Sequence, residues 1–404
     1  MKKIIVIGGG ASGLMAAICA ARLGAAVTIL EKMEKPAKKL QMTGNGRCNL
    51  TNTGADAAAA YCGADQIFIQ NILKQFTVAD TLNFFHDLGL LTKTRADYVY
   101  PYTDQAASVL EVLLLELRRW KVKLKCRETV TKIERQPLGF CVKTETWTYQ
   151  CDQVILAAGG KAVPLTGSDG SGYTLARQCG HRITPILPAL VPLRVKEAVV
   201  TSLAGTRSPV RLHLQIEDEQ RKPETGELQW TEYGVSGIVV FQVSRFAAVA
   251  LREGKSVKLQ IDLLPDYETN QILRLVAMKE QKNPAATREE LLAGILQKNV
   301  IAALLKSNAK DVTAAELITR ARSMTLTVIG TQTFERAQVC AGGVFSEEID
   351  ALTLESKKMP GLYMTGELID VDGICGGYNL QWAWSSAYVA GTHAAGYGLT
   401  KGNL

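Results

Sequence analysis

The first thirty residues alternate apolar runs with glycines in a pattern that predicts a strand, a helix and a second strand. Residues 3–7 (KIIVI) are apolar at both odd and even positions, as in a strand buried on both faces of a parallel sheet. Residues 14–23 are rich in alanine and stop at Gly24, a common helix terminator. Residues 26–30 form the next apolar run. This order of elements is typical of an α/β fold.

Two later segments also have an apolar run followed by small or glycine-rich residues. Residues 152–160 (DQVILAAGG) form an apolar run that ends in small residues. Near the end of the chain, residues 362–365 predict a short strand, and a glycine-rich turn and an apolar helix beginning near Asn379 follow it. We expect both segments to belong to the same domain as the first strand.

The middle of the chain has a different pattern. From about residue 191, short runs of alternating polar and apolar residues are separated by charged turns, which favours a small antiparallel sandwich or barrel. Residues 267–322 change to helical spacing, with a break between helices at Asn283-Pro284. Residues 324–331 (MTLTVIGT) are predicted to return to the β-rich module.

Composition and charge exclude several classes. The net charge is +7, from 46 basic and 39 acidic residues, and no dense basic block is present, so nucleic-acid binding is not expected. No apolar run reaches the roughly 20 residues of a membrane span. Nine scattered cysteines without a C-x-x-C pair indicate reduced thiols in the cytoplasm and argue against a metal site.

The turn after the first strand carries a dinucleotide fingerprint. Gly8, Gly10 and Gly13 fit G-x-G-x-x-G, in which the first glycine permits a tight turn and the second lets a pyrophosphate approach. The third lets the helix pack against the strand, and Glu31 ends the second strand where an acid accepts hydrogen bonds from ribose. An acid there also disfavours a 2′-phosphate. The alternative is a glycine-rich turn that serves packing alone.

The last glycine-rich segment decides which dinucleotide is expected. Gly366 and Glu367 follow a predicted strand, Asp370 could accept a hydrogen bond from a polyol, and Gly377 precedes the last helix. The free N–H groups at that helix start could face an electron-rich ring. Each segment alone is compatible with ordinary packing, but together with the first fingerprint they favour FAD over NAD.

The segment TGNGRCN is too polar and too rich in glycine for a strand or a helix. Gly44 and Gly46 could let backbone N–H groups converge on an anion, and Arg47 and Lys39 add positive charge. The alternative is a surface Asn-Gly turn. For Cys48, a buried inert thiol is favoured over a reactive one.

These patterns together predict a discontinuous first domain with an insertion. We expect an α/β fold in which a discontinuous Rossmann-like FAD-binding domain carries an antiparallel β-rich module and a small helical module. The expected boundaries are 1–190 and 334–404 for the FAD-binding domain, 191–266 and 324–333 for the β-rich domain, and 267–323 for the helical subdomain. A cleft between domains is the natural place for a small-molecule substrate.

At this point the chain resembles a known family, the BaiN/YhiN-type NAD(P)/FAD-dependent oxidoreductases, some of which carry an aminoacetone oxidase label. The matching segments run from IIVIGGGASGLMAA through KKLQMTGNGRCNLTN and TEYGVSGIVVFQVSR to GLYMTGELIDVDGICGGYNLQWAW, over nearly the whole chain. More distantly, the chain is similar to flavoprotein subunits of the fumarate reductase type. Together, the motifs and the resemblance assign cofactor contacts to Gly8, Gly10, Ser12, Gly13, Glu31, Lys32, Lys39, Gly44, Gly46, Arg47, Cys48, Asn49, Val130, Ala158, Gly159, Gly366, Glu367, Asp370, Gly377, Tyr378, Asn379 and Leu380.

Three functions follow as hypotheses. The first is reduction of an activated C=C bond in a small apolar molecule, steroid-like or bile-acid-like, with NAD(P)H as hydride donor; the resemblance motivates this substrate. The second is an amine oxidase or dehydrogenase of the aminoacetone type. The third is an RNA-associated flavoprotein. Because one good fingerprint is present and the GSDGSG segment at 167–172 lacks a preceding parallel strand, NAD(P)H is expected to meet the flavin directly and then leave.

No residue pattern identifies the catalytic proton donor. The four histidines lack partner patterns and are interpreted as structural: His86, His181, His213 and His393. The tyrosines of YVYPYTD, residues 98–104, and Tyr233 are interpreted as packing residues before catalytic ones. The sequence also leaves the oligomeric state open.

Overall fold

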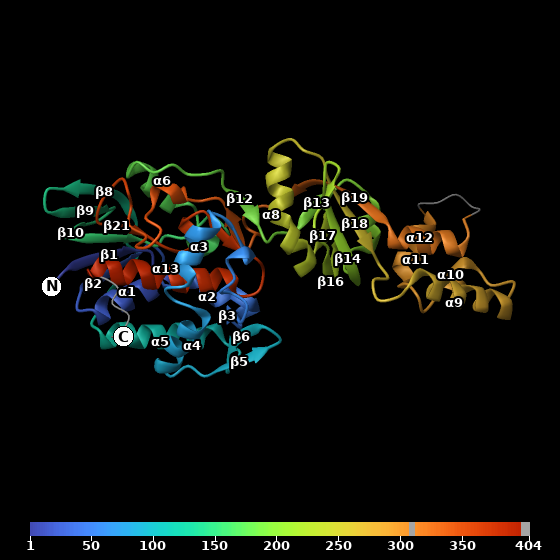
Figure 1. Cartoon of the computed structure of the whole chain (residues 1–404), viewed down its shortest axis with the longest axis horizontal. Coiled ribbons are helices and arrows are strands. Elements are labelled where there is room, and N and C mark those ends of the chain that lie inside the picture. Colours follow the sequence, from blue (N-terminus) through green and yellow to red (C-terminus); the bar gives the residue numbers. More distant parts are fainter. Residues whose placement is uncertain (307–311, 397–404) are drawn as a thin grey trace. The chain divides into compact units, whose positions relative to one another are not determined.

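The computed structural model describes residues 1–306 and 312–396, and the chain divides into two compact units (Figure 1). The first unit comprises Met1–Leu187 with Gln338–Leu404, and the second comprises Pro188–Ala337. The predicted helical segment lies in the same unit as the β-rich segment. A separate helical subdomain therefore stays a prediction.

The first unit is built on a parallel sheet, which confirms the predicted α/β class. Its five strands lie in the order β21-β11-β1-β2-β7. All neighbours are parallel, and Ile7 at the end of β1 lies opposite both Leu30 and Leu156. The bounds are Lys3–Ile7 for β1, Ala26–Glu31 for β2, Lys123–Cys126 for β7, Gln153–Leu156 for β11 and Leu362–Met364 for β21. The carboxyl ends of the first and last motif strands therefore meet at one edge.

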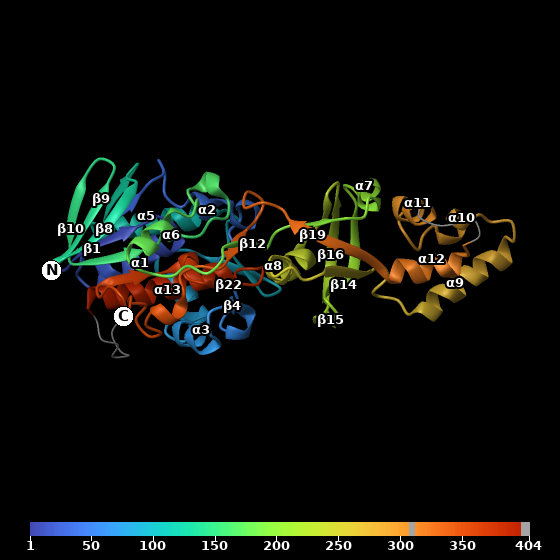
Figure 2. The same cartoon turned by 90° about the horizontal axis from the view of Figure 1, so that it is seen from above.

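Two helices from opposite ends of the chain pack together beside this sheet. Helix α1 spans Ala11–Arg22 and α13 spans Tyr378–Ala395, and the two lie side by side in Figures 1 and 2. A methyl group built on Gly391 of α13 would lie 2.5 Å from the carbonyl oxygen of Ala16, so the crossing needs a residue without a side chain. Helix α13 is buried along most of its length, and its buried residues include polar ones, such as Gln381 and Ser385, that form hydrogen bonds inside the unit.

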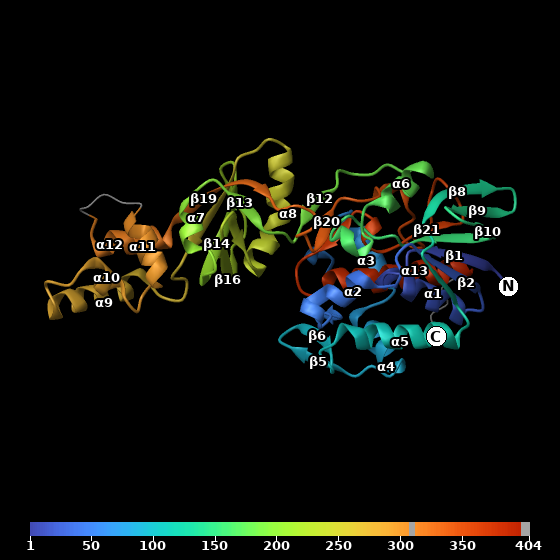
Figure 3. The same cartoon turned by 180° about the vertical axis from the view of Figure 1, so that it is seen from behind.

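Smaller elements complete the first unit. An antiparallel sheet β8-β9-β10 is visible in Figure 3, and β3-β6-β5 and β22-β4 form two more antiparallel sheets. The bounds of the strands are Thr51–Asn52 (β3), Tyr61–Gly63 (β4), Thr92–Arg95 (β5), Tyr98–Pro101 (β6), Val130–Gln136 (β8), Gly139–Thr144 (β9), Thr148–Cys151 (β10), Val339–Ala341 (β20) and Val371–Gly373 (β22). The division between the two units falls within strand β12 (Leu187–Ala189). The helices are Lys38–Met42 (α2), Gln66–Leu73 (α3), Val78–Asp87 (α4), Ala106–Arg119 (α5) and Ser171–Gln178 (α6).

The second unit contains a closed antiparallel barrel, which decides between the sandwich and the barrel left open by the sequence. The strand order is β14-β16-β17-β13-β19-β18, and a further pairing of β18 with β14 closes the ring. The bounds are Leu193–Val195 (β13), Arg207–Ile216 (β14), Glu224–Thr231 (β16), Gly234–Ser236 (β17), Val257–Asp262 (β18) and Met324–Thr331 (β19), with Glu219–Gln220 (β15) added at the edge of β14. Helices α7 (Val199–Leu203) and α8 (Ile238–Arg252) belong to the same unit.

Between the barrel strands β18 and β19, the described residues form four helices: α9 (Thr269–Lys282), α10 (Arg288–Leu292), α11 (Lys298–Lys306) and α12 (Ala314–Arg322). Helix α9 ends just before Asn283-Pro284, where the sequence predicted a break. Thr287 and Thr313 each form a capping box that fixes the start of the next helix. Across the described ranges, no helix combines the length and the apolar character that crossing a membrane requires.

Candidate cofactor site

The three glycines of the first turn have different surroundings. Gly8 has φ +107°, and a methyl group built on it would lie 2.5 Å from the carbonyl oxygen of Ala157. A methyl group on Gly13 would lie 1.9 Å from the carbonyl oxygen of Gly8, so α1 packs directly on β1. At Gly10 nothing lies within 4 Å of such a group, and this residue begins α1 without a side-chain cap. The turn therefore leaves open space beside the first N–H groups of α1, which have no hydrogen-bond acceptor within the helix.

Glu31 closes this turn from the neighbouring strand. Its side chain is buried, and its carboxylate accepts the N–H of Gly9 and the N–H of Met33, each at 2.7 Å. A carboxylate offers about four lone pairs, so capacity remains for a ribose hydroxyl. The amino group of Lys32 lies 2.5 Å from Asp169 and 3.1 Å from the hydroxyl of Ser171, so its charge faces the start of α6.

The last motif of the chain touches the first. A methyl group built on Gly366 would lie 2.6 Å from the hydroxyl oxygen of Ser12, in the first turn of α1. Glu367 forms a 2.6 Å ion pair with Lys39 and accepts the N–H of Cys340 at 2.9 Å. These contacts bring residues from three predicted segments into one place in the first unit.

Two predicted residues carry buried oxygen atoms without a hydrogen-bond partner. One is Oδ1 of Asp370, whose other oxygen accepts the hydroxyl of Thr184 at 2.7 Å. The second is Oδ1 of Asn49, at the end of the polar loop. An unpaired buried oxygen costs free energy, so each of these two atoms can accept a hydrogen bond from a bound ligand.

The polar loop between residues 43 and 49 runs through left-handed backbone. Gly44, Asn45, Gly46 and Cys48 all have φ between +55° and +82°. The N–H groups of Arg47 and Cys48 turn inward to carbonyl oxygens of the same loop, so neither is available to an anion. Arg47 is exposed, and burial raises the pKa of the Cys48 thiol to about 12. That thiol stays protonated and unreactive at neutral pH.

The second helix start is shaped by three neighbouring residues. Gly376 and Gly377 have φ of +115° and +103°, and Gly377 precedes α13 without a side-chain cap. The side chain of Asn379 accepts the N–H of Gly373 at 2.9 Å and donates to its carbonyl at 2.8 Å. These two hydrogen bonds fix the loop before α13. No side chain caps the helix, so its first N–H groups, at Tyr378 to Leu380, lack a side-chain acceptor.

Several protonated side chains border this helix start. A methyl group on Gly376 would lie 2.5 Å from the ring of Tyr98, which comes from the YVYPYTD segment. Burial raises the pKa of Tyr98 and Tyr378, and it raises the pKa of the Cys375 thiol to about 11. All three are therefore hydrogen-bond donors at neutral pH.

The remaining predicted residues lie along the same edge of the sheet. Ala158 packs against Gly172 at the start of α6, and Gly159 has φ +69°. Val130 begins β8, and the N–H of Glu128 just before it donates to the carbonyl of Glu31. Two buried polar residues were not predicted from the sequence: Gln381 in the first turn of α13, and Asn52, which donates to the carbonyl of Gly376 just before that helix.

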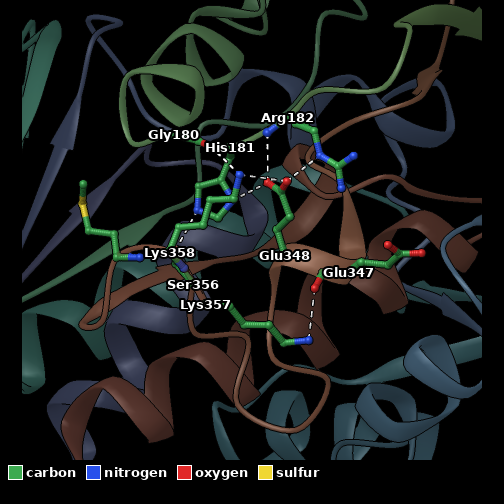
Figure 4. A network of polar contacts seen from close by, with 9 residues as sticks. Gly180, His181, Arg182, Glu347, Glu348, Ser356, Lys357 and Lys358 are labelled. Atoms are coloured by element: carbon green, nitrogen blue, oxygen red, sulfur yellow. Dashed lines mark hydrogen bonds and ion pairs between the residues drawn. The ribbon is translucent and has the colours of Figure 1, made fainter.

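His181 belongs to a network of polar contacts with Ser356 and Glu348 (Figure 4). The hydroxyl of Ser356 accepts two backbone N–H groups and lies 2.7 Å from Nε2 of His181, so the hydroxyl donates to that nitrogen. Nδ1 of His181 lies 3.3 Å from Glu348, which also pairs with Arg182 and Lys358. The arrangement of serine, histidine and glutamate resembles a catalytic triad. Because Ser356, His181 and Glu348 are all buried, a substrate cannot reach them, and we interpret the network as structural.

The residues present fit an FAD molecule. The open backbone at Gly10 suits a pyrophosphate, the spare capacity of Glu31 suits a ribose, and the unpaired oxygen of Asp370 suits a polyol chain. The uncapped start of α13 suits an electron-rich ring.

Comparison with known sequences adds a family. The profile of the HI0933-like protein Rossmann domain matches residues 2–393. The chain belongs to this HI0933-like family. It is 47% identical to a 3-dehydro-bile acid delta(4,6)-reductase of Clostridium scindens, over 98% of this chain and 99% of the relative. It is 30% identical to ribosomal RNA dihydrouridine synthases of Haemophilus influenzae and Escherichia coli, over 95% of this chain and 96% of each relative.

A solved structure supports the fold of the HI0933-like chain. A 3-ketosteroid-delta4-(5alpha)-dehydrogenase of Rhodococcus jostii RHA1, in complex with 4-androstene-3,17-dione, aligns with a TM-score of 0.53. The alignment covers 98% of this chain and 97% of the other at 16% identity, so it speaks for the fold alone. The family match and the 47% identity to a named reductase confirm the predicted resemblance to a family of oxidoreductases.

Proposed function

We propose that this protein is a cytoplasmic, FAD-dependent reductase that hydrogenates a C=C bond conjugated to a carbonyl group in a steroid-like substrate, using NAD(P)H. The observation that carries the proposal is the meeting of the first and last motifs, where Gly366 packs against Ser12 beside the open backbone of Gly10. A single extended dinucleotide can occupy both motifs only if they adjoin. The nine cysteines, none of which forms a disulfide, favour the cytoplasm.

The named relatives support the bond type. A 3-dehydro bile acid with double bonds at positions 4 and 6 is a conjugated dienone, and dihydrouridine is uridine with the C5–C6 double bond hydrogenated. In both, the reduced bond is conjugated to a carbonyl group, which draws electrons and makes the far carbon accept hydride. The higher identity of 47% favours the steroid-like substrate over the nucleoside.

Different residues of the chain would bind different parts of the cofactor. FAD, when bound, supplies a hydride carrier between the nicotinamide and the substrate. The first N–H groups of α1 would bind the pyrophosphate, Glu31 the ribose, and Asp370 with Glu367 the polyol chain. The helix dipole of α13 would stabilise negative charge at its start.

The reaction also needs one proton for each hydride, because hydrogenation adds a hydride to one carbon and a proton to the other. Tyr98, Tyr378 and Cys375 keep their protons at neutral pH beside the start of α13. These three side chains are the candidate proton donors.

The second candidate is reduction of uridine in folded RNA, which the 30% identical synthases favour. The modest net charge of +7 and the absence of a dense basic block in the sequence weigh against it. Amine oxidation is the third candidate, and none of the relatives named above supports it.

Anaerobic spectroscopy tests the proposal. The purified flavoprotein is reduced with NADH or NADPH and then mixed with a 3-oxo-4,6-diene steroid. We expect the steroid to restore the oxidised flavin spectrum, whereas a steroid with an isolated double bond should not. A uridine-rich ribosomal RNA fragment and an amine panel serve as the competing arms. If neither nicotinamide bleaches the flavin, or if only the RNA restores it, the proposal is wrong.

A further inference from the structure

A three-residue segment links the polar loop to helix α13. The carbonyl of Leu50 accepts the indole N–H of Trp384 at 2.9 Å. The hydroxyl of Thr51 donates to Oε1 of Gln381 at 2.6 Å, and the amide of Asn52 donates to the carbonyl of Gly376 at 3.0 Å. Each residue of segment 50–52 therefore makes its own hydrogen bond to α13 or to the turn before it.

These bonds are shielded from solvent. Leu50, Thr51, Gln381 and Trp384 have no exposed surface, and Asn52 is 3% exposed. Removing one partner of such a buried hydrogen bond lowers the stability of the folded protein, because the other partner then stays buried without a hydrogen bond. Each link therefore fixes the distance between two backbone segments.

Direct backbone contact reinforces the same link. A methyl group built on Gly377 would lie 2.5 Å from the carbonyl carbon and oxygen of Thr51. Strand β3 also pairs with β6, where Asn52 lies opposite Tyr98, and the ring of Tyr98 presses on Gly376. The turn that begins α13 is therefore in contact with both β3, at Thr51, and β6, at Tyr98.

The side-chain amide of Gln381 accepts hydrogen bonds from hydroxyl groups on two different elements. Its Oε1 accepts from Thr51 of β3 and, at 3.0 Å, from Thr81 of α4. Its nitrogen donates to the hydroxyl of Ser385 at 2.9 Å. Thr51 and Thr81 therefore have the same side chain, the same burial and the same acceptor atom, but only Thr51 belongs to the segment that continues the polar loop.

We propose that Thr51 and Asn52 are positioning residues that hold the polar loop, residues 43–49, at a fixed spacing from the start of α13, and thereby set the affinity and the reduction potential of the bound flavin. The inference rests on the proposed FAD site. The loop carries Asn49, whose buried Oδ1 lacks a partner, and α13 presents its uncapped N–H groups. A ligand held by both would lose contacts if either moved, and loss of the helix dipole would disfavour the electron-rich reduced state.

Matched substitutions at the two threonines provide the test. Thr51→Val and Thr81→Val remove the same donor from the same oxygen, so both should lower the melting temperature by a similar amount. We expect Thr51→Val to weaken FAD binding at least tenfold and to lower the midpoint potential, with Asn52→Ala having the larger effect. Thr81→Val should stay within twofold of the wild type in FAD affinity. FAD titration of the stripped protein and dye-coupled reduction measure the two quantities.

The outcomes separate this inference from the proposed function. A wild-type protein that binds no FAD overturns both. A wild-type protein that binds FAD, with Thr51→Val and Thr81→Val equal in affinity and potential, overturns the inference alone and makes the network a packing feature. Should Thr51→Val fail to fold, Thr51→Ser keeps the hydroxyl and is expected to retain wild-type affinity, while Asn52→Ala decides the question.

Discussion

Gly10 and Gly13 lie three residues apart in the same turn, and the structure gives them opposite roles. A side chain at Gly13 would collide with the backbone of Gly8, the residue after β1, whereas a side chain at Gly10 would enter open space in an ordinary extended conformation, with φ −80°. Gly13 therefore serves the fold, and Gly10 serves a ligand.

We expect Gly13→Ala to destabilise the protein by about 3 kcal/mol or to prevent folding, since the clash is with backbone and cannot be relieved by a rotamer change. Gly10→Ala should keep the wild-type melting temperature of the flavin-free protein and weaken FAD binding. Thermal melts of stripped protein and FAD titrations measure the pair. A Gly10→Ala variant with wild-type FAD affinity would contradict the assignment of this turn to the pyrophosphate.

Glu348 provides a prediction about acid stability. Burial alone would raise the pKa of Glu348, but hydrogen bonds from Lys358 and Arg182 outweigh it and hold the pKa at about 2. In the unfolded chain its ordinary value is 4.5, so as pH falls the unfolded state takes up the proton first. The stabilisation is complete above about pH 4.5 and is lost as pH falls toward 2. Burial also lowers the pKa of the adjacent His181, which acts in the same direction below 6.5.

Glu348→Gln should therefore be less stable than the wild type by about 2 kcal/mol at pH 7, because it leaves His181, Arg182 and Lys358 without their carboxylate. The difference should shrink steadily between pH 5 and pH 3. Urea unfolding at a series of pH values gives the two curves, and a difference that stays constant over this range would show that the network does not titrate in this way.

At the scale of elements, the crossing of α1 and α13 is the contact that brings the two ends of the chain together. Gly391→Ala places a methyl group 2.5 Å from the carbonyl oxygen of Ala16 and should force the helices apart, at a cost of about 2 kcal/mol. Gly330→Ala, in β19 of the other unit, meets nothing within 4 Å and should change stability by less than about 0.5 kcal/mol.

Both variants are compared by thermal melts and by FAD content after purification. Separation of α1 and α13 should also release FAD, because each helix start holds one part of the proposed site. Full FAD content in a destabilised Gly391→Ala variant would mean that the helix crossing and the cofactor site are independent.

Elements with a strong local signal were predictable. The strand at residues 3–7, the helix break at Asn283 and the strand at residues 324–331 all match the structure, because apolar periodicity and a proline act on neighbouring residues. The closure of the barrel was not predictable, since it depends on β18 reaching β14 across the sequence, and a sandwich has the same alternating pattern.

At the scale of the whole molecule, the sequence revealed the motifs but not the hydrogen bonds that join them in the fold. Glycine fingerprints have fixed spacing, so Gly10 and Gly377 could be named from the sequence. Asn52 contacts Gly376 across 324 residues, and Thr51 contacts Gln381 across 330. No local pattern marks such pairs, because a buried threonine or glutamine is chosen by a partner that only the fold supplies.

The central claim is that one FAD molecule lies across both the first and the last motif of this chain. Equilibrium titration of the flavin-stripped protein with FAD and with FMN tests it most directly, since FMN lacks the adenosine half that the α1 turn and Glu31 would hold. The account predicts one FAD bound per chain and FMN bound at least a hundredfold more weakly. A protein that binds neither flavin, or that binds FMN as tightly as FAD, would contradict it.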